Sequence, residues 1–215
     1  MAKKILGLLV VLMFALSVTV FAGVKEVTAK YDAGDIAGAI ADGKVLITKV
    51  SGDELIKANN VLGMALRANG EYAEAIKAFQ AMGNAKGAIE VAVTQVSSGD
   101  NVNAGKSADA AIATYPKDRY IQAYGEYLRG VVANRGGNIT EAQALFMDVL
   151  VNYQDQVAIC EYALPVTKFN KMTPDQADVI LLGWYRGITD KVAYANYLSM
   201  LVNNMSAKAQ ATLVK

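Results

Sequence analysis

The stretch Ser51–Phe79, SGDELIKANNVLGMALRANGEYAEAIKAF, decides the fold because it predicts two helices joined by a tight turn. In its first half, apolar residues recur at helical spacing and form one face. Asn69-Gly70 ends that half, since glycine reaches the left-handed conformation of a helix C-terminus at little cost. Ser51 and Glu54 have the spacing of a capping box, in which the two residues satisfy each other's free backbone N–H groups. The second half repeats the helical periodicity, with Tyr72, Ala75, Ile76 and Phe79 facing inward.

The residues of this hairpin match a known repeat pattern over most of one unit. The matching residues are Leu62-Gly63, Leu66, Gly70, Tyr72, Ala75 and Phe79. The set resembles the tetratricopeptide repeat, a unit of roughly 34 residues, and the best match covers 51–84. Asn59 stands where that family often has an aromatic residue, and the Pro that often closes the unit is missing. The resemblance implies an all-α fold, a right-handed α-solenoid of antiparallel helical hairpins.

Weaker copies of the pattern occur on both sides of this hairpin. Gly34, Gly70, Gly99 and Gly137 follow one another at an average spacing of about 34 residues, as in this repeat class. Asn138 and Glu141 also have capping-box spacing. No linker rich in Pro, Gly or Ser divides the chain, so the sequence predicts one helical repeat domain over 23–215. Its weaker units lie around 24–48, 86–116, 118–153 and 174–203.

The N-terminus has the pattern of an export signal. Lys3 and Lys4 precede an apolar run from Ile5 to Ala22, and small residues suit cleavage after Ala22. Residues 1–22 are therefore expected to be a signal peptide, and the mature protein is expected to be periplasmic or secreted. The alternative is an uncleaved N-terminal membrane anchor, because a run of about 18 apolar residues can just span a bilayer. The membrane is then reached through this segment alone.

Composition argues against several functional classes. The chain has no His and one Cys, so Ser-His-Asp and Cys-His sites are impossible and a zinc site is not expected. No metal, cofactor or catalytic residue is predicted. Without residues 1–22 the 21 basic residues fall to 19 against 20 acidic ones, which is not the charge of a nucleic-acid-binding protein. Cys160 has apolar neighbours and is interpreted as a buried small hydrophobe, with a reactive thiol as the alternative.

The resemblance also implies where a partner would bind, since the first helices of such hairpins line a concave groove. Transferred by their offsets from Gly63 and Gly130, the candidates fall on two helices. Tyr120, Tyr124 and Tyr127 share one helix, and two interpretations of them remain open: they pack between hairpins, or they form an interface. The candidate groove residues are Lys57, Asn60, Met64, Arg67, Tyr124, Tyr127, Val131 and Asn134.

These observations lead to one expected function and two alternatives. We expect a non-catalytic scaffold or adaptor that binds a protein or peptide partner in the cell envelope. The first alternative is a hydrolase that uses two carboxylates to cleave cell-wall sugar, which requires two acids to converge in a cleft. The second is a carrier of an apolar small molecule, which requires a sizeable apolar cavity between the helices.

Overall fold

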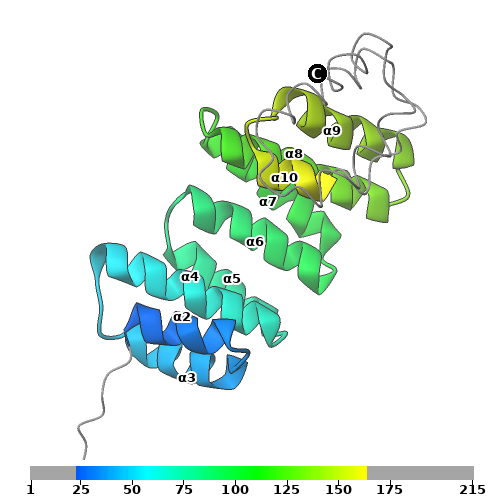
Figure 1. The fold of residues 1–215 in the computed structure, drawn as a ribbon. Coiled ribbons are helices and arrows are strands. Elements are labelled where there is room, and N and C mark those ends of the chain that lie inside the picture. Colours follow the sequence, from blue (N-terminus) through cyan, green and yellow to red (C-terminus); the bar gives the residue numbers. More distant parts are fainter. Residues whose placement is uncertain (1–22, 164–215) are drawn as a thin grey trace, which may run out of the picture. The chain divides into compact units, whose positions relative to one another are not determined.

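The computed structural model describes residues 23–163, and this part of the chain is entirely helical (Figure 1). The predicted signal segment 1–22 and the predicted repeat unit 174–203 lie outside the described residues. The described chain divides between Glu71 and Tyr72 into two compact units. We call these the N-terminal unit (23–71) and the C-terminal unit (72–163).

The all-helical prediction is confirmed for the described residues, and the helix boundaries lie close to the predicted ones. The N-terminal unit contains α2 (Val24–Asp32), α3 (Ile36–Leu46) and α4 (Gly52–Ala68). The C-terminal unit contains α5 (Tyr72–Ala81), α6 (Ala85–Ser98), α7 (Asn101–Thr114), α8 (Arg119–Arg135), α9 (Ile139–Asn152) and α10 (Val157–Ala163).

In the N-terminal unit, α2, α3 and α4 pack against one another around small and branched apolar side chains. Gly43 on α3 lies against Leu62 of α4, where an added Cβ would meet Leu62 Cδ1 at 3.1 Å. Asn59, which replaces the expected aromatic residue, is buried and donates its amide to the Leu55 carbonyl at 3.0 Å. The local bond satisfies the buried amide, so a polar residue is tolerated in this position.

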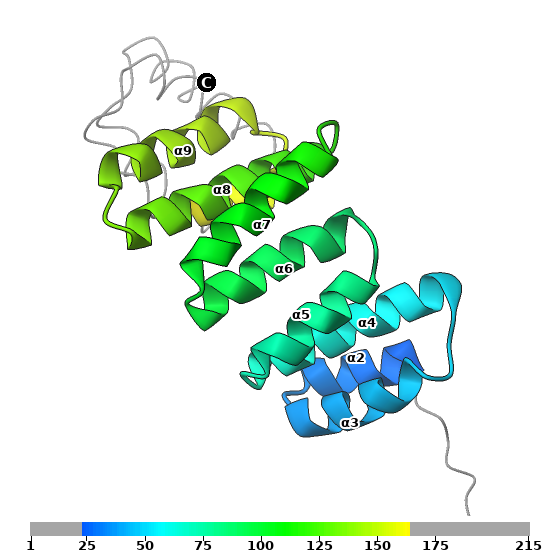
Figure 2. The same ribbon diagram turned by 180° about the vertical axis from the view of Figure 1, so that it is seen from behind.

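In the C-terminal unit, each helix packs against the next one in sequence, from α5 through to α10. Helices two apart also meet, because α8 contacts both α6 and α10. The short α10 lies in front of α8 in Figure 1 and behind it in the reverse view of Figure 2. Helix α8 therefore has α6 and α10 as neighbours, and the candidate surface lies on α8 and α10.

Left-handed glycines end the first helix of successive hairpins, as the glycine series predicts. Gly34, Gly70, Gly99 and Gly137 have φ angles of 81°, 80°, 84° and 83°. A side chain at such a φ costs roughly 1–2 kcal/mol, so glycine is the residue that fits. The four turns are therefore built alike, although their spacing along the sequence is uneven.

Of the two capping-box predictions, the one at Asn138 is confirmed for its N-cap half only, because the Asn138 backbone N–H donates to the Ala133 carbonyl, and the one at Ser51 is wrong. Asn138 accepts a hydrogen bond from the Glu141 backbone N–H at 3.4 Å, and its amide donates to the Glu141 carboxylate. Ser51 does occupy the N-cap of α4, but its side chain makes no capping hydrogen bond. The next residue, Gly52, has a φ of 57°. This left-handed step turns the chain at the first residue of the helix, which leaves the serine hydroxyl without the usual approach to the N–H groups.

Helices α8 and α9 meet where Gly130 of α8 contacts Phe146 of α9. These two residues have the same separation in the sequence as Gly63 and Phe79. The Phe146 ring is 1% exposed and lies so close to Gly130 that an added Cβ would overlap it. The Phe146 ring therefore packs directly against the backbone of Gly130, and the lack of a side chain at Gly130 lets the two helices approach closely. The close approach explains why a residue with poor helix propensity stands inside α8.

Candidate partner-binding surface

The tyrosines predicted to share a helix face do so on α8. Tyr120, Tyr124 and Tyr127 recur at intervals of four and three residues, which brings their side chains to one side of a helix. Val131 and Asn134 continue the same face toward the end of the helix. The four candidates taken from α8 are thus neighbours, with Asn134 exposed and the other three partly buried.

The rings form one continuous cluster, to which α10 adds a fourth tyrosine. Tyr120 and Tyr124 meet edge-to-face with ring centroids 5.7 Å apart, and Tyr124 and Tyr127 are 6.1 Å apart. Tyr162 lies 6.2 Å from Tyr124 and 6.0 Å from Tyr127. We call Tyr120, Tyr124, Tyr127 and Tyr162 the tyrosine surface.

Tyr162 was not among the residues predicted from the sequence. It follows Tyr124 by 38 residues, the same step that separates Gly99 from Gly137. That offset marks it as the counterpart of Tyr124 on the next first helix. Tyr162 was not predicted because the apolar residues around Cys160 suggested a buried segment, and Cys160 is indeed fully buried. Tyr162 lies on the other side of the short α10 and is 51% exposed.

The tyrosines differ in how far the fold itself needs them. Tyr124 and Tyr127 pack against two clusters of buried residues, one formed by α6, α7 and α8 and the other by α8, α9 and α10. Tyr127 also contacts the Phe146 ring at 5.9 Å between centroids. Tyr120 and Tyr162, in contrast, are 37% and 51% exposed. The packing role thus falls to Tyr124 and Tyr127, and the exposed aromatic area is contributed by Tyr120 and Tyr162.

Two hydroxyls of the tyrosine surface, those of Tyr120 and Tyr127, have raised pKa values. Burial raises the pKa of Tyr120, and the nearby Glu90, Tyr162 and Asp118 raise it further. Burial and Tyr162 likewise raise the pKa of Tyr127. Between residues 23 and 163, no hydrogen bond engages the hydroxyls of Tyr120, Tyr127 or Tyr162. Within the described residues these three hydroxyls are therefore not used by the fold.

Opposite charges flank the two ends of the tyrosine surface. The carboxylates of Glu90 and Asp118 lie near Tyr120, whereas Arg135 lowers the pKa of Tyr127 and so lies near that ring. Arg135 donates to the Val96 carbonyl and, at 3.3 Å, to Asn101 Oδ1. Carboxylates thus lie near the Tyr120 end of the surface, and a guanidinium lies near the Tyr127 end.

Arg119 holds the segment that leads into α10. Its Nε donates to Asp155 Oδ2 at 2.8 Å, and its Nη2 donates to the Asn152 carbonyl at 2.8 Å. The guanidinium also lies over the Tyr153 ring, 5.2 Å from its centroid. One side chain of α8 therefore bonds to the turn after α9, which leads into α10 and Tyr162.

We expect the Arg119→Ala variant to raise the pKa of Asp155, because the hydrogen bonds from Arg119 hold that pKa well below its usual range. A carboxyl whose folded pKa is lowered stabilises the fold above its unfolded pKa of about 3.9, and this contribution is lost as the pH falls further. The wild type should therefore lose stability in that acidic range more steeply than the variant. Carboxyl ¹³C NMR titration of Asp155 measures the shift directly, and an unchanged pKa in the variant would contradict the assignment.

The four candidates of the N-terminal unit share one face of α4 but form a different kind of surface. Lys57 is exposed, whereas Asn60, Met64 and Arg67 are partly buried. The Asn60 amide contacts the Met64 sulfur at 3.9 Å, and Asn60 Oδ1 is buried without a hydrogen-bond partner. The eight predicted residues thus fall into two sets of four in two units, and the aromatic contacts belong to the set on α8.

Glu126 bears on the hydrolase alternative, because the pKa of this carboxyl is raised. Burial is the main cause, and Asp148 and Asp109 add to it, while Arg129 opposes it. Arg129 Nη1 donates to both carboxylate oxygens of Glu126, at 3.1 and 3.2 Å, and Arg129 also pairs with Asp109. Glu126 lines none of the cavities described below. Arg129 thus pairs with Glu126 on its own helix α8 and with Asp109 of α7, which is a structural ion-pair arrangement.

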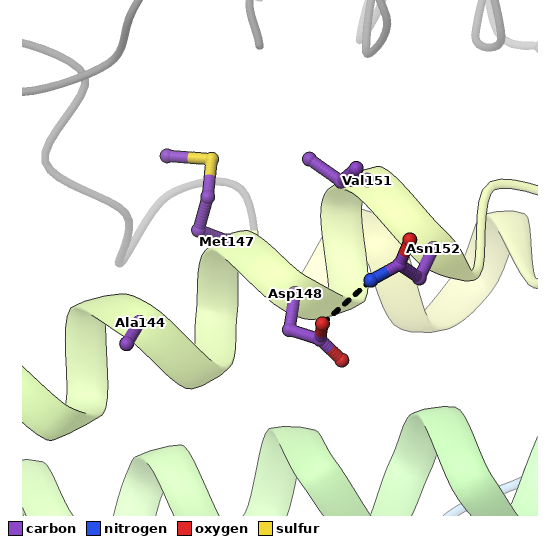
Figure 3. A pocket seen from close by; sticks show the side chains of 5 residues that line it. All are labelled: Ala144, Met147, Asp148, Val151 and Asn152. Atoms are coloured by element: carbon purple, nitrogen blue, oxygen red, sulfur yellow. Dashed lines mark hydrogen bonds between the residues drawn. The ribbon is translucent and has the colours of Figure 1, made fainter.

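Three cavities of the C-terminal unit bear on the carrier alternative. One of about 290 Å³ lies along α9, where Met147 and Val151 stand on one side and Asp148 points away from them (Figure 3). Another, of about 310 Å³, lies between the end of α5 and Tyr115. The largest, of about 500 Å³, lies beside Tyr120 and is lined by Asn84, Ala85, Lys86, Asp118, Tyr120 and Ile121. All three open to solvent, so none encloses an apolar ligand.

Among residues 23–163, no three His, Cys, Asp or Glu side chains gather as a metal ion would require. The described helices include none with the length and apolar character needed to cross a bilayer. No protein-family model matches the sequence, and no curated protein is significantly similar to it.

Proposed function

We propose that this protein is a non-catalytic scaffold that binds a polypeptide partner on the tyrosine surface of α8 and α10. The exposure of Tyr120 and Tyr162 carries the proposal, since the two rings are 37% and 51% exposed while they contact the packed ring of Tyr124. Following the tetratricopeptide-like pattern, we place the site on the inner side of a helical solenoid. Following the N-terminal pattern, we place the protein in the cell envelope, periplasmic or secreted.

The residue types of the tyrosine surface and their rigid support favour this assignment. Tyrosine offers a large contact area, loses little rotamer entropy on binding and retains a polar tip, so it is enriched in binding hot spots. Tyr124 and Tyr127 are held by two buried clusters, and Arg119 fixes the approach to α10. A rigid aromatic surface lowers the cost of ordering an interface. The alternatives have no comparable support, because Glu126 is paired with Arg129 and the cavities are open.

Site-specific photocrosslinking in the native envelope tests the proposal. A photoreactive phenylalanine analogue replaces Tyr120 or Tyr162 in the full chain, and both positions should yield the same protein adduct on irradiation. Val102 provides the matched control, because it is a 70% exposed apolar residue of the same unit on α7. A second Tyr→Ala change at the position without the analogue should weaken the adduct.

The crosslinking experiment has two outcomes that would contradict the proposed binding site. Equal crosslinking from position 102, or none from positions 120 and 162, would refute the tyrosine surface as the binding site. Circular dichroism of each variant checks that the helices persist. Tyr120 and Tyr162 suit the test better than Tyr124 and Tyr127, because replacing the latter two disturbs both buried clusters.

A further inference from the structure

We propose that the open groove along α9 is the docking site of the chain's own C-terminal residues. The occupant is the helix that the sequence predicts from Pro174 onward, in the repeat unit 174–203. We call the site the α9 groove, and it is lined by Ala144, Met147, Asp148, Val151 and Asn152 (Figure 3). The proposal goes beyond the proposed function, because the α9 groove shares no residue with the tyrosine surface.

The α9 groove has only one wall in the part of the chain that the structure describes. Its volume is about 290 Å³, and the five described residues that line it all belong to α9. Met147 and Val151 pack against the buried cluster of α8, α9 and α10, and they also line the groove. Both side chains are only partly buried. A second wall would bury more of their apolar area, which is favourable.

Helix α10 is too short to provide that wall along the whole of α9. At about 1.5 Å per residue, the 7 residues of α10 extend about 10 Å, whereas the 14 residues of α9 extend about 21 Å. Helix α10 also packs against α8 as well as against α9. At least about half of the length of α9 is therefore left for a further element of the chain.

The spacing of the lining residues favours a helix as the occupant. The lining residues recur at intervals of three, one, three and one, which is the stripe by which a helix packs against another element. On the helix predicted from Pro174, Val179, Leu182 and Arg186 form a corresponding stripe. Its two apolar residues match the apolar pair of the groove, and its arginine matches the carboxylate of Asp148.

The chain's own C-terminal part can reach the α9 groove directly. Helix α10 packs against α9 and ends at Ala163, and 52 residues follow it. The residues between Ala163 and Pro174 can span up to about 35 Å, which exceeds the length of α9. A short tether gives an effective concentration in the millimolar range. The chain's own helix therefore has the advantage over a second copy or a separate partner of equal intrinsic affinity.

The net charges of the two parts are complementary. Residues 72–163 contain 7 basic and 10 acidic side chains, a net charge of −3. Residues 164–215 contain 6 basic and 3 acidic ones, a net charge of +3. At the groove, Asp148 Oδ1 accepts a hydrogen bond from Asn152 Nδ2 at 2.6 Å, which holds the carboxylate on the face of α9 that lines the groove. We therefore expect Arg186 to pair with Asp148.

Site-specific photocrosslinking of the purified full chain tests the proposal. Benzoylphenylalanine replaces Leu182, or Val179 as a second position, and mass spectrometry maps the adduct. We expect an adduct with residues 144–152 of the same chain, in a yield that does not change when the protein is diluted. Ala177 is the matched control, because it lies on the opposite face of the same predicted helix and should give no adduct with α9. Circular dichroism checks that the helices of each variant persist.

Charge reversal tests the pairing within the α9 groove. Asp148→Arg and Arg186→Asp should each lower the yield of the adduct from position 182 about twofold or more, and the two changes together should restore most of it. Glu74→Arg is the matched control, since it makes the same change in net charge at an exposed residue of α5. It should leave the yield unchanged.

Three results would overturn the proposal: adducts that map outside α9, equal adducts with α9 from position 177, or adducts found only between two chains. The last of these would mean that a second copy occupies the groove. A double reversal that restores no yield would exclude the pairing of Asp148 with Arg186, and with it this packing of the two helices. The proposed function is judged separately, because an adduct within one chain requires no partner from the envelope.

Discussion

Replacing Phe146 with alanine should lower the free energy of unfolding by about 3–5 kcal/mol, the usual cost of removing a buried aromatic ring. The ring is 1% exposed, lies in the cluster formed by α8, α9 and α10, and contacts Tyr127. Its loss leaves a cavity that neighbours fixed on rigid helices can fill only in part. Urea denaturation of the full chain, followed by circular dichroism, measures the change.

Val151→Ala provides the control for this variant, because Val151 lies on the same helix and is only partly buried. It should cost well under half as much. A loss below about 1 kcal/mol for Phe146→Ala would show that the site collapses freely and would contradict the close packing seen here. Because Tyr127 rests on the same ring, the Phe146→Ala variant should also weaken partner binding at the tyrosine surface.

Gly130→Ala should destabilise the protein by about 1–3 kcal/mol, although alanine is the better helix former. The added methyl group would overlap the Phe146 ring, and that ring is enclosed. Gly105→Ala is the matched control, since its new Cβ would meet Val132 Cγ1 at an ordinary 3.6 Å. The control should be neutral or gain up to about 1 kcal/mol, as expected for glycine replaced by alanine inside a helix.

The same pair of residues offers an internal check. In a Phe146→Leu background the ring is gone, so Gly130→Ala should cost measurably less than it does in the wild type. Equal costs in the two backgrounds would mean that the methyl group collides with something other than the ring. Thermal unfolding of the four proteins in the cycle provides the comparison.

Much of the fold could be predicted because its signals are local. Helix periodicity, the N-cap Asn138 and the left-handed glycines each act within a few residues, and the described helices begin and end close to the expected positions. The Ser51 prediction failed for an equally local reason, since Gly52 adopts a positive φ that the pattern of capping residues does not reveal. Sequence spacing identifies where a cap residue stands but does not fix its dihedral angles.

The candidate surface was only half predictable because its contacts join distant parts of the chain. The helical spacing of Tyr124 and Tyr127 placed them on one face. Two other contacts depend on how the helices pack. The ring of Tyr162 lies 38 residues beyond Tyr124 in the sequence, and Arg119 pairs with Asp155, which is 36 residues away. Periodicity within one helix contains no information on which residue of another helix lies opposite. Only the repeat offset, applied to a short helix, could have indicated Tyr162.

The double packing of Tyr124 and Tyr127 has a consequence for how the C-terminal unit unfolds. Both rings contact the two buried clusters, so neither cluster can lose its order without exposing side chains that the other one needs. Linear arrays of helices often open from their ends in small steps. Here the tyrosines couple α6 to α9, and the amide protons of these helices should exchange with solvent as one cooperative foldon. The residues proposed to recognise the partner would then also determine how much of the protein opens at a time.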